Sequence, residues 1–169
     1  MSNNVKTIQT STFENCISLR SISNGNSVEL VGNRAYAYCT SLTAVTTSSY
    51  RGIGNTAFIN CKFSSFTVQN NVLSSIGNDA FNSCTSLTSV NLPNSLKSIG
   101  IKAFIGDSAL KVVDIGGNSL SIGQQAFDGC QSLNTLTFKS NCNLASIGDY
   151  AFRNCTALSS RLAFPAQLK

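Results

Sequence analysis

The sequence contains no histidine, and only 11% of its 169 residues are charged. Without histidine, the usual arrangements for general acid–base catalysis and for activating a nucleophile are absent. The seven acidic residues fall in different parts of the chain and show no recurrent pairing of the kind that a two-carboxylate site requires. We therefore expect the protein not to be an enzyme.

Other kinds of site are also missing from the sequence. The seven cysteines form no Cys-x-x-Cys pair, which excludes the usual spacings of structural metal sites. No run approaches the ~18 consecutive apolar residues of a membrane span. The net charge is +5, but the basic residues are scattered. We expect no cofactor or metal, no nucleic-acid partner and no insertion into a membrane.

The sequence does contain a repeat of about 23 residues. The segment Ser-Ile-Gly-x-x-Ala-Phe occurs at 75–81, 98–104, 121–127 and 146–152. Aligning the chain on the aromatic position gives seven copies, with Phe13, Tyr36, Phe58, Phe81, Phe104, Phe127 and Phe152 in one column. Three residues later, a second column holds cysteine in every copy except one, which has Asp107. A fixed period of this length indicates a solenoid.

Each copy continues with an alternating segment. Residues 87–92 (Leu-Thr-Ser-Val-Asn-Leu) and 133–138 (Leu-Asn-Thr-Leu-Thr-Phe) place an apolar residue in the middle and at both ends of the pattern. This alternation predicts a strand with one buried face. The rest of the repeat is too short for a full helix. We predict that Gly-x-x-Ala-Phe-x-x-Cys forms one short helical or 3₁₀ turn, with the alanine and the aromatic residue facing inward.

The repeat resembles the BspA-like, or Treponema pallidum-type, class of leucine-rich repeats, whose motif is roughly Leu-x-x-Ile-x-Leu-Pro…Ile-Gly-x-x-Ala-Phe-x-x-Cys. The fourth copy fails only at Asp107 and matches at Leu87, Val90, Leu92, Pro93, Leu96, Ile99, Gly100, Ala103 and Phe104. The resemblance implies one solenoid domain over residues 1–169. Its expected form is a right-handed, curved α/β superhelix of about seven turns with a concave parallel β-sheet. The class serves adhesion, protein binding and assembly, so the fold does not select among them.

The strand alternation also identifies the residues expected on the exposed face of the concave sheet. In the first three copies these include Ser21, Ser23, Ala44, Thr46, Ser65 and Thr67. We expect a protein partner to bind further along, at Ser89, Asn91, Val112, Asp114, Thr135, Thr137, Lys139 and Arg161. The charges on this face occur only in that second set. The first hypothesis is therefore a non-catalytic protein-binding or adhesion module.

The alternative is a structural protein that assembles end to end. Both ends of the sequence stop inside a repeat, and we expect exposed apolar residues there at Val5, Ile8, Leu162 and Phe164. Open strand edges pair readily with another chain, and soluble monomers rarely expose large apolar patches. Head-to-tail stacking would continue the repeat into filaments. Two competing explanations are that the chain is a fragment and that its polar terminal residues act as minimal caps.

The cysteine column has two interpretations. Free cysteine is among the most buried residue types, and this favours buried thiols. Neighbouring turns would also lie within the disulfide window of about 4.4–6.8 Å between Cα atoms, which leaves the pairs 16–39, 61–84 and 130–155 as the alternative. Asp107 is expected where water or a backbone amide reaches it. Cys142, outside the column, is expected to be exposed and reactive, and it is the nucleophile of an enzyme alternative.

Three further expectations concern glycine, location and ice. The glycines that follow isoleucine, once per repeat, are expected at corners that need a positive φ or a close approach of the backbone. Residues 1–6 lack the apolar segment of a signal peptide. We expect a cell-surface or secreted protein whose leader is absent from this chain, with a cytoplasmic location as the alternative. Ice binding is disfavoured, because the expected sheet is curved and its rows mix residue types.

Overall fold

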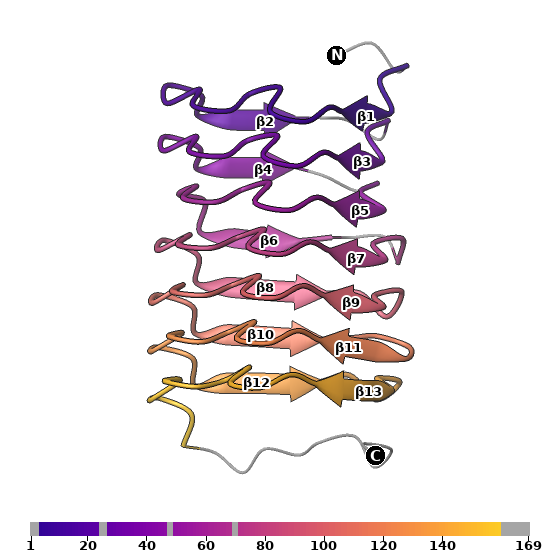
Figure 1. The fold of residues 1–169 in the computed structure, drawn as a ribbon, viewed down its shortest axis with the longest axis vertical. Helices are drawn as coiled ribbons and strands as arrows, with labels where there is room; N and C mark the ends of the chain where they lie inside the picture. Colours follow the sequence, from indigo (N-terminus) through magenta and orange to yellow (C-terminus); the bar gives the residue numbers. More distant parts are fainter. Residues whose placement is uncertain (1–3, 24–26, 47–48, 69–70, 160–169) are drawn as a thin grey trace.

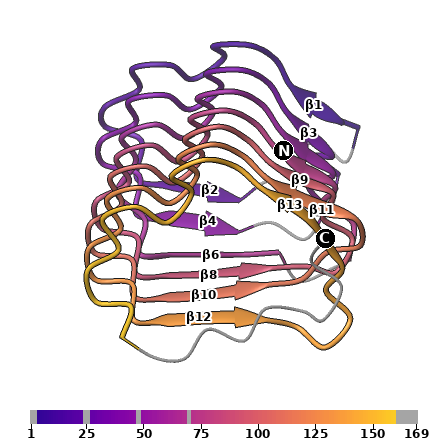
Figure 2. The same ribbon diagram turned by 60° about the horizontal axis from the view of Figure 1, so that its bottom comes forward.

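The computed structural model describes residues 4–23, 27–46, 49–68 and 71–159. In these ranges the chain forms a parallel β-solenoid of about six turns, built from thirteen short strands and no helix (Figure 1). Figure 2 shows the odd-numbered and even-numbered strands on separate sides of the solenoid, with turns closing the remaining side. None of the described segments forms a helix that could span a membrane.

The odd-numbered strands form one seven-stranded parallel sheet that follows the order of the sequence. They are β1 (Thr7–Ile8), β3 (Leu30–Val31), β5 (Gly52–Ile53), β7 (Ser75–Ile76), β9 (Ser98–Ile99), β11 (Leu120–Ile122) and β13 (Leu144–Ile147). Most of them arise from the Ser-Ile-Gly segments. Their register stacks Ile76 on Ile99 and Ile99 on Ile122, so that these three strands bury their isoleucines in one stack.

The even-numbered strands arise from the alternating segments. They are β2 (Ser21–Ser23), β4 (Ala44–Thr46), β6 (Ser65–Thr67), β8 (Ser89–Leu92), β10 (Val112–Ile115) and β12 (Thr135–Phe138). Strands β2 and β4 pair with each other, and β6, β8, β10 and β12 form a four-stranded parallel sheet. Val90, Val113 and Leu136 are buried at the middle of their strands, and this confirms the predicted alternation.

The segment between the glycine and the cysteine column, which we call the turn wall, is not helical. Residues 100–107 are an example: Lys102 has a φ of 57° and Gly106 a φ of 74°, and equivalent residues in every copy are also positive. Every second N–H group from Lys102 to Gly106 donates a hydrogen bond to a carbonyl of the following turn. Phe104 N, for example, donates to Ala126 O at 2.7 Å. The others stay inside their own turn, as when Ala103 N donates to Gly100 O at 3.3 Å. The helical or 3₁₀ prediction is therefore wrong, because left-handed residues recur every four positions and no helix continues through them.

The aromatic column stacks through the core, as predicted. From Phe13 to Phe152, successive ring centroids lie 4.9–5.5 Å apart. The rings of Phe81 and Phe104 are nearly parallel, at 2°. In the third copy, Phe63 and Phe66 replace aliphatic residues and pack against Phe58 and Phe81. The ladder therefore defines the axis on which the turns are stacked.

The repeated glycines are required by close approach and not by a positive φ. A Cβ on Gly100 would lie 2.5 Å from the carbonyl carbon of Gly77, and a Cβ on Gly77 would lie 2.6 Å from that of Gly54. Real Cβ atoms do not approach backbone this closely, so a side chain at either position would push the turns apart. Of the two reasons expected from the sequence, close approach is correct.

Two parts of the predicted fold class are wrong. The solenoid has no α component in the described residues, and it has about six turns in place of seven. Seven motif copies give six turns because each complete turn needs one even-numbered and one odd-numbered strand, and β1 has no even-numbered strand before it. The alternating segment of the last copy, with Arg161, Leu162 and Phe164, lies outside the described residues. The right hand and the concave curvature stay predictions.

Candidate functional site

The residues expected to bind a partner lie together on the outer face of β8, β10 and β12. The register aligns Ser89, Val112 and Thr135 in one row. It aligns Asn91, Asp114 and Thr137 in a second row. We call these the two polar rows, although Val112 is an exposed apolar residue within the first. Arg161, the remaining member of the predicted set apart from Lys139, lies outside the described residues.

Lys139 connects the strands of the second row. Its Nζ donates to Asn91 Oδ1 at 2.7 Å and to the Leu92 carbonyl at 2.8 Å, and it lies 3.7 Å from Asp114 Oδ2. Thr137 Oγ1 donates to Asp114 Oδ1 at 2.8 Å. The positive and negative groups of this face therefore neutralise each other and fix the polar side chains around them.

The contacts of Lys139 extend beyond the neighbouring turn. Extending the register of β10 and β12 by one residue places Lys139 beside Gly116, and Leu92 lies one turn further away. The lysine side chain therefore spans the turn of Gly116 and contacts the turn beyond it. Both ionic side chains remain about one-third exposed, so the pair positions the surface more than it stabilises the fold.

The N-terminal half of the same face carries small neutral residues. Ser21, Ser23, Ala44, Ser65 and Thr67 are exposed on β2, β4 and β6. No ion pair forms on these three strands within the described residues. The charged part of the face is therefore limited to its C-terminal half, as the sequence predicted for its described members.

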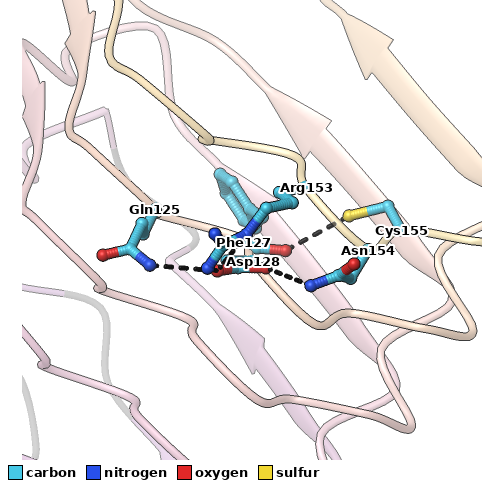
Figure 3. A network of polar contacts seen from close by, with 6 residues as sticks. All are labelled: Gln125, Phe127, Asp128, Arg153, Asn154 and Cys155. Carbon is cyan, nitrogen blue, oxygen red and sulfur yellow. Dashed lines mark hydrogen bonds and ion pairs between the residues drawn. The ribbon is translucent and has the colours of Figure 1, made fainter.

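A second polar cluster lies on the turn wall and was missed in the sequence (Figure 3). The buried Asp128 accepts hydrogen bonds from Arg153 Nε at 3.0 Å, Gln125 Nε2 at 3.1 Å and Asn154 Nδ2 at 3.0 Å. The bond from Arg153 is the main cause of the lowered pKa of Asp128. The guanidinium also lies 4.8 Å from the ring of Tyr150, which is 58% exposed. A signal for the pair was available, because both Asp128 and Arg153 directly follow the aromatic residue of their copies.

A related arrangement occurs near the first turn. Arg34 bonds to Glu14 through its Nε at 3.0 Å, and its guanidinium lies 6.0 Å from the ring of Tyr38. Bonds from Arg34 lower the pKa of Glu14 to about 2. Both clusters link consecutive turns through an arginine, a carboxylate and a tyrosine. We assign them to holding the turn wall together.

The structure contradicts the expectation for Cys142. This residue is only 6% exposed, and burial raises the pKa of its thiol. A buried thiol with a raised pKa is a poor nucleophile. The expectation of an exposed, reactive cysteine, on which the enzyme alternative depends, is therefore wrong.

The cysteine column consists of free thiols. All members after Cys16 are buried, and burial raises the pKa of Cys39 to about 11 and that of Cys61 to about 12. The interpretation as buried thiols is confirmed for every cysteine of the column except the exposed Cys16, and the disulfide pairs 16–39, 61–84 and 130–155 are not formed. Over the described ranges, no three residues of the types that bind metals are grouped as ligands.

The predicted assembly residues at the first turn differ in their placement. Val5 is exposed, whereas Ile8 lies in the core and stacks on Val31. Phe13 and Leu19 are only partly buried at this end, and Cys16 is exposed. The apolar cross-section expected here is thus partly open, but Ile8 does not belong to its surface. Leu162 and Phe164 lie outside the described residues.

Comparisons with known proteins agree with this architecture. A family model described as BspA type leucine rich repeat region, in six copies, matches residues 1–51 and 51–169. The crystal structure of a T. pallidum leucine-rich repeat protein has 31% identity and a TM-score of 0.80, covering 90% of this chain and 71% of that chain. A leucine-rich repeat protein from Bacteroides ovatus has 22% identity and a TM-score of 0.53, covering 93% of this chain and 58% of that one. The second likeness concerns the fold alone. No curated protein matches the chain.

Proposed function

Since the chain belongs to the BspA-type leucine-rich repeat family, we propose that it is a non-catalytic protein-binding or adhesion module whose contact surface is the two polar rows. Leucine-rich repeat proteins generally bind protein partners. The observation that carries the proposal is the network in which Lys139 joins Asn91, Leu92 and Asp114 across three turns. Side chains fixed in this way lose little conformational entropy when a partner binds.

The chemistry of the face favours a protein partner of low net charge. The Asp114–Lys139 pair leaves no local excess of either sign, and Val112 supplies an exposed apolar contact between Ser89 and Thr135. Such a surface gives little electrostatic steering, so association is expected to be moderate in rate and weakly dependent on salt. A cell-surface or secreted location fits this role and the family, and the cytoplasm is the alternative.

The test removes the network and measures binding. A photoreactive side chain at Thr135 is used to capture a partner from a mixture of extracellular proteins, and the captured protein is then purified. We expect Asp114→Ala with Lys139→Ala to weaken its affinity at least about tenfold, while the unfolding midpoint stays close to that of the wild type. The control is the double alanine variant of the Lys6–Glu29 pair, which has the same charge types at the start of other strands.

Two results would contradict this placement. One is an unchanged affinity of the Asp114/Lys139 variant for the captured protein. The other is an equal loss in the Lys6/Glu29 control. A third substitution, Arg161→Ala, tests whether the predicted site extends to that residue.

The second candidate function is end-to-end assembly with another copy of this chain. It is supported by the position of β1, which is the first strand of the seven-stranded sheet and has a neighbour on one side only within the described residues. It is also supported by the partial exposure of Phe13 and Leu19 at that end. We expect light scattering after size exclusion to show concentration-dependent polymers. Val5→Asp and Phe164→Asp should disperse them, because both residues are predicted at the contact. A strictly monomeric protein at high concentration would exclude this function.

A further inference from the structure

The thiols of the cysteine column make a recurrent hydrogen bond that the sequence did not indicate. Each of these cysteines directs its Sγ to the backbone carbonyl of the aromatic residue in the preceding turn. The distances are 3.1–3.2 Å for Cys39 to Phe13, Cys61 to Tyr36, Cys84 to Phe58, Cys130 to Phe104 and Cys155 to Phe127. The same carbonyls accept one backbone N–H within their own turn. The thiol therefore supplies the second donor that a buried carbonyl oxygen accommodates.

Asp107 interrupts this series. It occupies the column between Cys84 and Cys130, so the carbonyl that its side chain faces by register is that of Phe81. Asp107 Oδ1 accepts the N–H of Cys84 at 2.8 Å, and the same N–H is 3.0 Å from Phe81 O. The carboxyl group of Asp107 and the carbonyl of Phe81 therefore both accept the N–H of Cys84. Asp107 Oδ2 is buried and has no hydrogen-bond partner.

An ionised carboxylate does not suit this position. Asp107 is fully buried and forms no ion pair with any described residue. A carboxylate here would place an unpaired charge in the core and would leave its buried Oδ2 without a hydrogen-bond donor. Burial raises the pKa of Asp107 well above its ordinary value, and the hydrogen bond from Cys84 opposes this only in part.

We propose that Asp107 is a neutral carboxylic acid in the folded protein and that its Oδ2–H donates to the Phe81 carbonyl, in place of the thiol found in the other turns. The residue then satisfies both neighbours, because Oδ1 accepts from Cys84 and Oδ2 donates to Phe81. Folding consequently takes up one proton at this position. The contact between Asp107, which precedes β10, and the turn that precedes β8 is therefore stable in mild acid. It weakens as the pH rises.

The groups around Asp107 do not obscure this effect. The titratable groups facing it are the thiols of Cys84 and Cys130, and both have a pKa raised by their surroundings. Lys62 acts on Cys84. In the next turn, the pKa of Asp128 is lowered by Arg153. The chain has no histidine, ordinary carboxyl groups titrate below about pH 5, and ordinary thiols above about pH 8. Cys155 differs from the other thiols, because its hydrogen bond with Cys130 lowers its pKa, but a lowered pKa in the folded state makes stability rise with pH. A loss of stability with rising pH between about pH 5.5 and 7.5 is therefore the signature of Asp107.

The sign of the effect follows from proton linkage. The unfolded chain releases the Asp107 proton near pH 4, whereas the folded protein keeps it, so stability falls with rising pH until the folded group also ionises. One bound proton corresponds to an unfolding equilibrium constant that rises about tenfold per pH unit. We expect urea unfolding of the wild type to show this dependence between about pH 5.5 and 7.5.

Asp107→Asn is the matched variant, because its amide keeps an acceptor for Cys84 N and presents an N–H to Phe81 O without titrating. We expect its unfolding constant to be independent of pH over the same range. Asp107→Cys, which restores the column, is expected to behave in the same way. Asp114→Asn is the control on the surface and should retain the tenfold dependence per unit.

Infrared spectroscopy of the wild type gives a readout that does not require a variant to fold. Isotope labelling of aspartate at the carboxyl carbon is expected to shift a carboxylic acid C=O band that persists at pH 7, and Asp107→Asn should lack that band. The proposal is overturned if no protonated aspartate is seen at pH 7. It is also overturned if the pH dependence of unfolding persists in Asp107→Asn.

Discussion

Phe104 lies in the interior of the aromatic ladder, and its replacement by alanine is the sharpest test of how the solenoid is held together. Its ring is fully buried and stacks on both Phe81 and Phe127 at 4.9 Å. Phe→Ala changes in cores cost about 3–5 kcal/mol, and each aromatic pair adds about 0.5–1.5 kcal/mol beyond its buried area. Allowing for overlap between these contributions, we expect Phe104→Ala to lower the free energy of unfolding by about 4–6 kcal/mol.

Phe13→Ala provides the matched comparison. Phe13 is only partly buried and has one stacking partner, Tyr36, at 5.1 Å. Half of the core cost and one aromatic pair, with the same allowance for overlap, give about 2–3 kcal/mol. The two variants remove the same side chain, so the difference between their losses of stability measures the combined effect of full burial and of stacking on both sides.

Urea unfolding followed by far-UV circular dichroism measures both variants. A repeat protein is held by contacts between neighbouring turns, so a cavity at Phe104 should also allow the two halves to unfold separately. The transition should then broaden and its m-value should fall. Equal losses of stability in Phe104→Ala and Phe13→Ala would refute the reasoning, because the ladder would then not act as a continuous core.

Three further predictions follow from the close contacts, the buried ion pair and the thiols. Gly100→Ala should destabilise the protein by about 1–3 kcal/mol, because the added Cβ would overlap the backbone of the neighbouring turn. The control is Gly52→Ala, whose Cβ would lie 3.3 Å from a flexible leucine side chain. This variant should lose less than about 1 kcal/mol in the same urea assay. Arg153→Ala should reduce stability at neutral pH, and its difference from the wild type should vanish on acidification. The reason is the lowered pKa of Asp128, since such a stabilisation exists above the ordinary carboxyl pKa and is lost as the pH falls. Thermal melts of both proteins at pH 7 and pH 3 measure this difference. In a thiol titration of the folded protein, Cys16 alone of the seven cysteines should react rapidly, and all seven should react in urea; a second fast thiol in the native protein would contradict the burial described above.

The columns of the repeat were sufficient to predict the core. Residues at the same position of consecutive copies have equivalent surroundings, so Phe81, Phe104 and Phe127 had to stack if the copies stacked. The strand alternation succeeded for the same reason, because a period of two places Val113 inside and Asp114 outside without further information. The number of turns could not be predicted from the seven copies. Each complete turn contains two strands, and the aligned motif shows only how often one part of the turn recurs.

The turn wall could not be predicted in the same way. Its first left-handed position holds residues such as Arg34, Lys102 and Gln125, and nothing in these residue types indicates a positive φ. Hydrogen bonds to neighbouring turns hold the backbone in that conformation, which is a tertiary effect. Cys142 was misjudged because its position outside the column does not show whether an inserted loop folds over it. The contacts of Lys139 with Asn91 and Leu92, two turns away, appear only once the register is known.

The direction of the hydrogen bonds in the turn wall has an electrical consequence. From its first left-handed residue to its second, the turn wall sends every alternate N–H to a carbonyl of the following turn, from Ser11 to Asn33 O at the start to Gly129 to Arg153 O at the end. Each peptide carries a dipole of about 3.5 D, and here these dipoles add along the solenoid axis, whereas those of β-sheets largely cancel. The wall is thus negative toward its first turn and positive toward its last, the reverse of an α-helix. Two copies that met head to tail would bring opposite potentials together, and two copies that met head to head would not.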